Sequence, residues 1–124
     1  MRVVAPSELR LPSAAYSHGV VAGDMMFLAG QCGVDGDGNV VGEDVATQTS
    51  QAIANLEIVL SAGGFALTDI VYVTAFLADL SDFDGYDRAY AEAFGEHRPA
   101  RATVRADIYS SALLVELQAI ARKD

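Results

Sequence analysis

The sequence has one cysteine, three prolines, two histidines and no tryptophan. A single cysteine, Cys32, excludes an internal disulfide and is typical of a reducing cytoplasm. The cysteine and histidines lack metal-ligand spacing, so we expect neither a metal nor another cofactor. No apolar run reaches the ~18 residues of a membrane span, and the N-terminal residues lack the apolar core of a signal peptide. These absences predict a cytoplasmic protein without a membrane segment.

Basic residues are also scarce, with 8 against 17 acidic residues and a formal net charge of −9. Proteins bind nucleic acid largely by neutralising phosphates, so an acidic surface disfavours a nucleic-acid partner. The alternative is that the acidic excess merely keeps the protein in solution. Neither interpretation favours RNA as the main partner.

Hydrophobic periodicity predicts one α+β domain spanning residues 1–124. Asp44 is placed to cap a helix of roughly five turns that stops at Gly63-Gly64. A second helix begins near residues 81–83 and ends at Gly95. The strands are expected at 19–22, 25–29, 70–77, and on both sides of a turn at 109–111. Both helices are expected on one face of the sheet, yet strand 70–77 is apolar on both faces, which predicts an oligomer.

The two C-terminal strands carry most of the charged residues of interest. Alternation with period two places Arg101, Arg105 and Glu116 on the same side of the sheet if these strands form a hairpin. In that register Arg105 lies opposite Glu116, an ordinary cross-strand ion pair worth up to ~1 kcal/mol. Arg101 has no such partner, and a guanidinium fixed on a strand suits a planar carboxylate.

Several motifs follow one another in a specific order along nearly the whole chain. They are Tyr16-Ser17-His18, Ala29-Gly30-Gln31, Asn55-Leu56 with Gly63-Gly64, the stretch 76–83, Pro99-Ala100-Arg101, and Val115 to Ala121. This ordered set resembles the Rid family, the YjgF-type enamine/imine deaminases, some of which carry the name L-PSP endoribonuclease.

The resemblance implies a chorismate-mutase-like fold, a homotrimer, and a site in each cleft between subunits. It implies that Arg101 binds a substrate carboxylate, that Glu116 handles the hydrolytic water, and that Tyr16 reaches across the subunit boundary. Ala29 and Gly30 match the family's Ser-Gly pair, and Asp87 and Thr103 also match pocket positions. Ala29 replaces a serine, Asp87 an asparagine, Thr103 a small residue or cysteine, and Gln118 a glutamate. These departures retain the arginine and the first glutamate but alter the pocket lining.

Our leading hypothesis is a cofactor-free hydrolase of small carboxylate-bearing enamines or imines, of the 2-aminoacrylate and 2-iminopropionate type. A non-catalytic module that binds a keto acid is the alternative, and an endoribonuclease is a third. Ammonia release above the spontaneous rate distinguishes the enzyme from the binding module. His18 is interpreted as a local hydrogen-bonding residue and Cys32 as a buried thiol.

Overall fold

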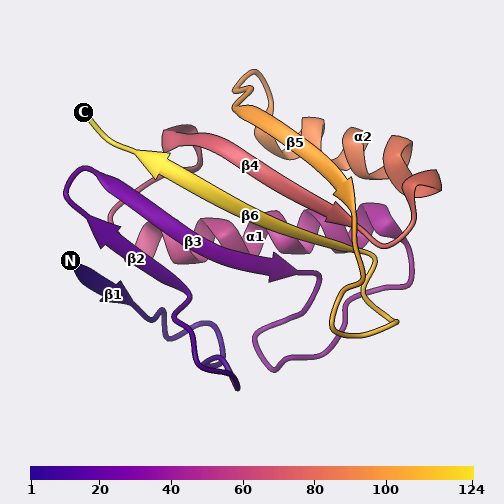
Figure 1. The fold of residues 1–124 in the computed structure, drawn as a ribbon, viewed down its shortest axis with the longest axis horizontal. Coiled ribbons are helices and arrows are strands. Elements are labelled where there is room, and N and C mark those ends of the chain that lie inside the picture. Colours follow the sequence, from indigo (N-terminus) through magenta and orange to yellow (C-terminus); the bar gives the residue numbers. More distant parts are fainter.

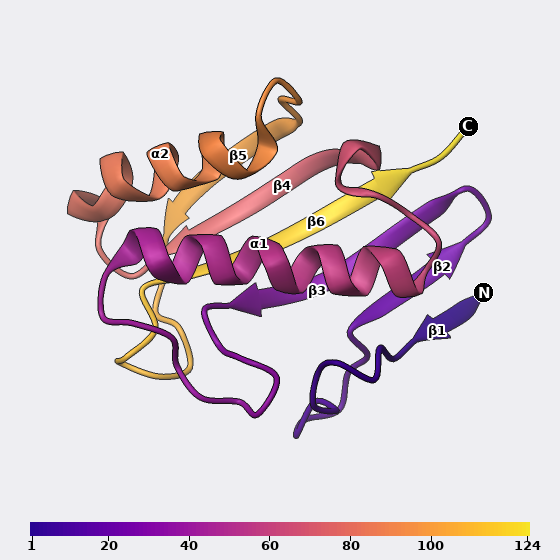
Figure 2. The ribbon, with the colours of Figure 1, turned by 180° about the vertical axis from the view of Figure 1, so that it is seen from behind.

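The computed structural model describes residues 1–124 as a six-stranded sheet with two α-helices against one face (Figures 1 and 2). Two short 3-10 helices, Leu67–Asp69 and Leu80–Asp82, precede β4 and α2 respectively. The main elements are β1 (Arg2–Val4), β2 (Gly19–Ala22), β3 (Met25–Cys32), α1 (Val45–Ala62), β4 (Ile70–Leu77), α2 (Phe83–Phe94), β5 (Ala100–Arg105) and β6 (Val115–Arg122).

Helix α1 begins and ends where its local chemistry predicts. The Asp44 carboxylate accepts the backbone N–H of Thr47 at 2.9 Å, which satisfies one of the free donors of the first turn. At the other end Gly63 is the C-cap, and Gly64 has a φ of +83°, a left-handed conformation that glycine adopts without a Cβ clash. The predicted helix is confirmed at both ends.

The order of strands across the sheet is β1-β2-β3-β6-β4-β5. Strand β5 pairs in parallel with β4, and the other neighbours are antiparallel. A parallel pair needs a crossover connection, which α2 supplies between β4 and β5. The predicted hairpin of β5 with β6 is therefore wrong, because β4 lies between them and the loop 106–114 leads across the sheet.

The expected pair of Arg105 with Glu116 is wrong for the same reason. Arg105 is the register partner of Leu77 in β4, whereas Glu116 of β6 is the register partner of Phe76 across the opposite edge of that strand. Hydrogen bonds from Ser81 lower the pKa of Asp79, and the charge of Arg105 adds to this effect. Arg105 therefore has Asp79 as its acidic neighbour.

The two faces of the sheet differ in cover. Figure 2 shows both helices in front of the sheet, and Figure 1 shows the opposite face without a helix. The covered face holds the core residues of the strands, including Met26, Leu28, Val73, Ala75, Val115 and Leu117, which pack against Ile53, Leu56, Val59 and Leu60 of α1. The expected arrangement of two helices on one face is confirmed.

A continuous row of apolar residues crosses the uncovered face. Each member is the register partner of the next on the neighbouring strand, so the row spans all six strands. Four of its members are exposed, namely Ala100, Val3 at 56%, Phe27 at 45% and Tyr72 at 37%. In order across the sheet the apolar row is Val3, Val20, Phe27, Ile120, Tyr72 and Ala100.

The loop before β6 is fastened to α1 by one buried side chain, Gln48. Its amide oxygen accepts the backbone N–H of Leu114 at 2.8 Å, and its nitrogen donates to the carbonyl oxygen of Ala112 at 3.0 Å. A second donation reaches the carbonyl oxygen of Gly42 at 3.2 Å. Because β6 begins at Val115, these hydrogen bonds determine the position of Glu116 at the start of that strand.

Replacing Gln48 by leucine should therefore destabilise the fold by about 1–3 kcal/mol, since the Leu114 N–H loses its acceptor in a partly buried position. Urea unfolding at a fixed protein concentration measures the change. Glu57→Ala, at an exposed position of α1, is the control and should stay within about 0.5 kcal/mol of the parent. An unchanged unfolding midpoint for Gln48→Leu would contradict the fastening role.

Candidate functional site

The guanidinium of Arg101 lies on the covered face of the sheet, between β5 and α2. Arg101 is the register partner of the fully buried Val73, so both side chains point toward the helices. Its Cζ lies 4.6 Å from the ring centroid of Tyr90 and 5.0 Å from that of Tyr86. Stacking of this kind holds the planar group in one orientation.

The aromatic platform under Arg101 follows from the spacing of residues along α2. Phe83, Tyr86, Tyr90 and Phe94 recur at intervals of three and four, so they share one side of the helix. Their rings contact one another in series, with the Tyr90 and Phe94 rings stacked at 4.4 Å. The helix was predicted from the sequence, but the role of these aromatics in supporting Arg101 was not.

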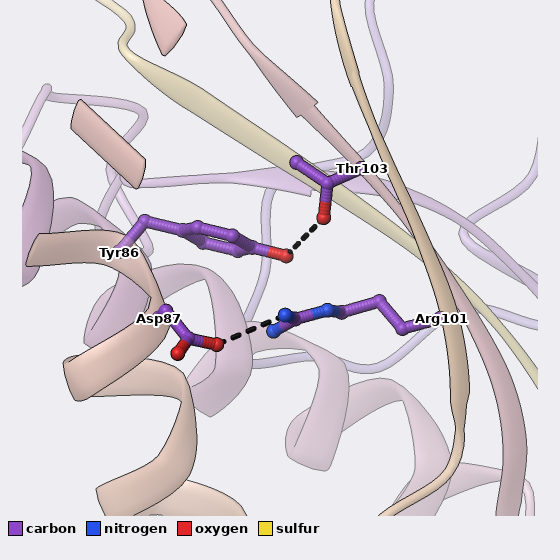
Figure 3. A network of polar contacts seen from close by, with 4 residues as sticks. All are labelled: Tyr86, Asp87, Arg101 and Thr103. Atoms are coloured by element: carbon purple, nitrogen blue, oxygen red, sulfur yellow. Dashed lines mark hydrogen bonds and ion pairs between the residues drawn. The ribbon is translucent and has the colours of Figure 1, made fainter. Parts of the chain in front are cut away.

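Two polar contacts complete this cluster, and Figure 3 shows both contacts from close by. Arg101 Nη2 donates to Asp87 Oδ1 at 2.9 Å, and the hydroxyls of Tyr86 and Thr103 are 2.8 Å apart. We call Tyr86, Asp87, Tyr90, Arg101 and Thr103 the Arg101 cluster. The structure thus brings together three residues that the sequence had singled out, namely Asp87, Arg101 and Thr103.

The Arg101 cluster opens onto a hollow of about 290 Å³ lined by Asp87, Tyr90, Arg98, Pro99 and Arg101. Two guanidinium groups and one carboxylate give this hollow a net positive charge. Burial raises the pKa of Tyr90 to about 12, against the opposing effect of Arg101. The Tyr90 hydroxyl therefore stays neutral, and it is buried without a hydrogen-bond partner. The hollow is suited to a small anion.

Glu116 lies on the opposite face of the sheet, which corrects the expectation that it shares a side with Arg101. Its neighbours Val115 and Leu117 point into the core, so the alternation of β6 turns Glu116 toward the uncovered face. Strand β4 also separates β5 from β6, and Arg101 pairs with Val73 whereas Glu116 pairs with Phe76, so their backbones are more than about 10 Å apart. One chain does not bring the two together.

A second set of polar groups surrounds Glu116. The thiol of Cys32 donates to Glu116 Oε1 at 3.3 Å. The register of β3 against β6 shifts between Leu28 and Gln31, an irregularity that contains Ala29 and Gly30 and brings Gly30 beside this carboxylate. A Cβ added to Gly30 would lie 2.5 Å from Glu116 Oε2, so only glycine permits this approach.

Two tyrosines complete what we call the Glu116 cluster, with Gly30, Cys32 and Glu116. Partial burial raises the pKa of the Tyr109 phenol, and the nearby Cys32, Tyr16 and Glu116 raise it further. The Tyr109 phenol therefore lies near Glu116 and near Tyr16, although both tyrosine side chains are largely exposed. Tyr109 was assigned only to a turn from sequence, because nothing in the pattern showed that its loop folds back over β3 and β6.

His18 takes no part in either cluster. Its Nε2 donates to the carbonyl oxygen of Arg10 at 2.7 Å, and its Nδ1 accepts from the Gln31 amide at 3.2 Å. The interpretation of His18 as a hydrogen-bonding residue of the fold is confirmed. No group of three or more His, Cys, Asp or Glu residues is arranged to hold a metal ion, and no helix is long and apolar enough to cross a membrane.

The family model for Endoribonuclease L-PSP matches residues 7–123 of the chain. The chain belongs to this family. It is the family, also known by the name YjgF, that the ordered motifs had suggested. The family name does not by itself assign a ribonuclease activity.

Three relatives illustrate the similarity. A RutC family protein of Pyrococcus horikoshii is 39% identical over 114 residues, covering 91% of this chain and 90% of the relative. A 2-iminobutanoate/2-iminopropanoate deaminase of Salmonella typhimurium is 36% identical over 109 residues, covering 86% and 85%. The crystal structure of a putative endoribonuclease of Thermotoga maritima superposes with a TM-score of 0.93 at 35% identity, covering 100% of this chain and 98% of that one.

The environment of Cys32 makes a prediction about its reactivity. Burial raises the pKa of the thiol, and the charge of Glu116 and the hydrogen bond to it raise the pKa further. A raised pKa lowers the thiolate fraction near neutral pH, so iodoacetamide should alkylate the native protein much more slowly than the urea-unfolded chain. Because Cys32 is the only cysteine, mass spectrometry of the intact chain measures the rate directly.

The same measurement on Glu116→Gln isolates the contribution of the carboxylate. Removing its charge lowers the thiol pKa, so the native variant should react faster than the native parent. Equal rates for both native proteins would show that Glu116 does not control Cys32.

Proposed function

We propose that this protein hydrolyses small reactive enamines or imines that carry a carboxylate, releasing a 2-keto acid and ammonia in the cytoplasm without a cofactor. The observation that carries the proposal is the guanidinium of Arg101, which is held by aromatic rings at the edge of a hollow of net positive charge. The similarity of the chain to the Salmonella deaminase supplies the reaction class.

Arg101 and Glu116 act together in this proposal only if two copies of the chain meet. Within one chain they lie on opposite faces of the sheet, and each cluster is half of a site. The apolar row on the uncovered face gives a second copy a surface to pack against. We propose a homotrimer in which the Arg101 cluster of one subunit faces the Glu116 cluster of the next, with Tyr16 at the boundary.

The chemistry then needs few groups. An enamine tautomerises to the imine, whose carboxylate binds Arg101 through paired hydrogen bonds. Glu116 takes a proton from a water molecule as the water oxygen attacks the imine carbon, giving a carbinolamine. That proton is passed to nitrogen, the hydroxyl proton follows it as the carbon–nitrogen bond breaks, and a 2-keto acid and ammonia are released. Such imines also hydrolyse in water, so positioning and one general base suffice.

A ribonuclease activity finds less support. The net charge of −9 opposes the approach of a polyanion. The hollow beside Arg101, of about 290 Å³, is suited to a small carboxylate rather than to a strand of RNA. A module that binds keto acids without turnover shares the same ligand chemistry, and kinetics rather than binding separates it from the enzyme.

The assembly can be tested first. Because the apolar row is uncovered in one chain, and because the resemblance to the Rid family implies three subunits, the protein should form a homotrimer of about three times 13.1 kDa. Native mass spectrometry and light scattering at micromolar concentration measure the mass. Charging the row by Phe27→Glu should weaken the assembly, whereas Val40→Glu, at an exposed residue outside the sheet, should not. A stable monomer of the parent protein would overturn the shared site.

Variants of Arg101 and Glu116 test the two roles. Arg101→Ala should lose both keto-acid binding and imine turnover, and Arg101→Lys should restore little, because an ammonium cannot reproduce the planar fork. Glu116→Gln should retain binding and lower turnover by about 10²-fold. Calorimetry with pyruvate and the decay of freshly generated 2-iminopropionate measure binding and turnover. Equal loss of binding and turnover in Glu116→Gln would contradict the water-handling role.

Mixing the two inactive variants tests whether the site is shared. Co-refolded Arg101→Ala and Glu116→Gln subunits form some interfaces with an intact Arg101 from one copy and an intact Glu116 from the other. With random assembly about a quarter of the sites are restored, so turnover should recover to roughly that fraction of the parent rate. Arg101→Ala mixed with the double variant restores no site and is the control. No recovery in the first mixture would place the two roles elsewhere.

A further inference from the structure

Asp87 sits beside the group assigned to the substrate carboxylate, although it carries the same charge as that carboxylate. Its Oδ1 accepts one hydrogen bond from Arg101 Nη2 at 2.9 Å. It lines the same hollow, and 47% of its side chain remains accessible against 22% for Arg101. A guanidinium has five N–H donors, so the single bond leaves Arg101 donors for a ligand.

Structural support for Arg101 does not require this carboxylate. The Tyr86 and Tyr90 rings already fix the plane of the guanidinium, and a partly exposed ion pair contributes little to stability. For a simple anion Asp87 is unfavourable, because it repels the charge that Arg101 attracts. The arrangement of Arg101 and Asp87 is complementary to a ligand that carries a hydrogen-bond donor next to its carboxylate.

A 2-imino acid is such a ligand. Its carboxylate and its protonated nitrogen are borne on adjacent carbon atoms, so a negative and a positive group lie side by side. The neighbouring Arg101 and Asp87 form the complementary pair, a positive and a negative group 2.9 Å apart. The carboxylate can bind the free donors of Arg101 while the nitrogen donates to Asp87.

We propose that Asp87 is a specificity-determining residue that accepts a hydrogen bond from the substrate nitrogen and so selects 2-iminium acids over 2-keto acids. This inference rests on the proposed function and names its substrate form. The protonated imine is also the better electrophile, so selecting it favours attack by water. After hydrolysis the product presents a carbonyl oxygen, an acceptor, where the substrate presented a donor. Its unfavourable contact with Asp87 promotes product release.

The overall step balances. The iminium zwitterion CH₃–C(=NH₂⁺)–COO⁻ and one water give pyruvate and an ammonium ion. A carbon–oxygen bond forms, the carbon–nitrogen bond breaks, and both water protons finish on nitrogen. No oxidant or reductant takes part.

Two stable ligands of equal charge separate the donor effect from simple repulsion. Pyruvate and oxamate are planar monoanions of similar size, and oxamate carries an N–H donor that pyruvate lacks. Calorimetry on the parent protein should show oxamate binding roughly tenfold or more tightly, since a hydrogen bond to a charged group is worth about that factor. Asp87→Ala should bring the ratio of the two affinities close to one, and the affinity for pyruvate should rise.

Asp87→Asn keeps the shape of the side chain and one acceptor oxygen, so it guards against a folding defect in the alanine variant. It should bind pyruvate more tightly than the parent does and show a smaller oxamate preference. Glu92→Gln removes an acidic charge from the same helix in the groove between α1 and α2, away from Arg101, and should leave the ratio unchanged. Circular dichroism and native mass spectrometry check that each variant keeps its fold and assembly.

The result distinguishes this inference from the proposed function. A parent protein that accelerates imine decay but binds pyruvate as tightly as oxamate would overturn the role of Asp87 and leave the deaminase intact. An unchanged ratio in Asp87→Ala would do the same, as would the absence of binding for both ligands. A preference for oxamate that depends on Asp87, without any imine turnover, would support the inference about the site and contradict the catalytic function.

Discussion

The parallel pairing of β5 with β4 determines most of what this chain can do. Helix α2 connects the two strands and packs against them, so the side chains of β5 that point toward α2 lie under its aromatic residues. Arg101 is one of these, and its guanidinium is stacked against Tyr86 and Tyr90 as a consequence. The same pairing makes β5 an edge strand and leaves the position beside β4 to β6, which carries Glu116 on the other face.

Periodicity predicted the local elements because the residues that set them are close in sequence. The apolar positions of α1, its Asp44 cap and its glycine stop were sufficient for the helix. Strand pairing between β5 and β6 failed because consecutive strands usually pair, and no local pattern showed that loop 106–114 was too long for a tight turn. The predicted pair of Arg105 with Glu116 and the predicted placement of Arg101 and Glu116 on one side of the sheet both assumed the β5–β6 hairpin, so both were wrong.

The sequence predicted which residues form the candidate site better than it predicted how those residues are arranged. Arg101, Glu116, Asp87 and Thr103 were found through motifs, and the structure groups three of them around one guanidinium. Tyr86 and Tyr109 were not assigned to the site, because their contributions depend on a helix lying over β5 and on a loop folding back across the sheet. Contacts between elements distant in sequence leave little trace in a single sequence, whereas the residue types required by a reaction do leave one.

The opposite faces of the sheet meet different physical demands, and the proposed assembly reconciles them. The covered face gains its stability from α1 and α2 and supports Arg101, so it needs no second copy of the chain for its stability. The uncovered face carries the apolar row, and two rows further along the strands, beyond Thr74 and Gln118, Cys32, Glu116 and Phe76 are register partners. In the proposed assembly a second copy covers the apolar row for hydrophobic reasons and extends along the same face to Glu116. Burial of apolar surface and completion of a polar site are then one event, and a monomer would have neither.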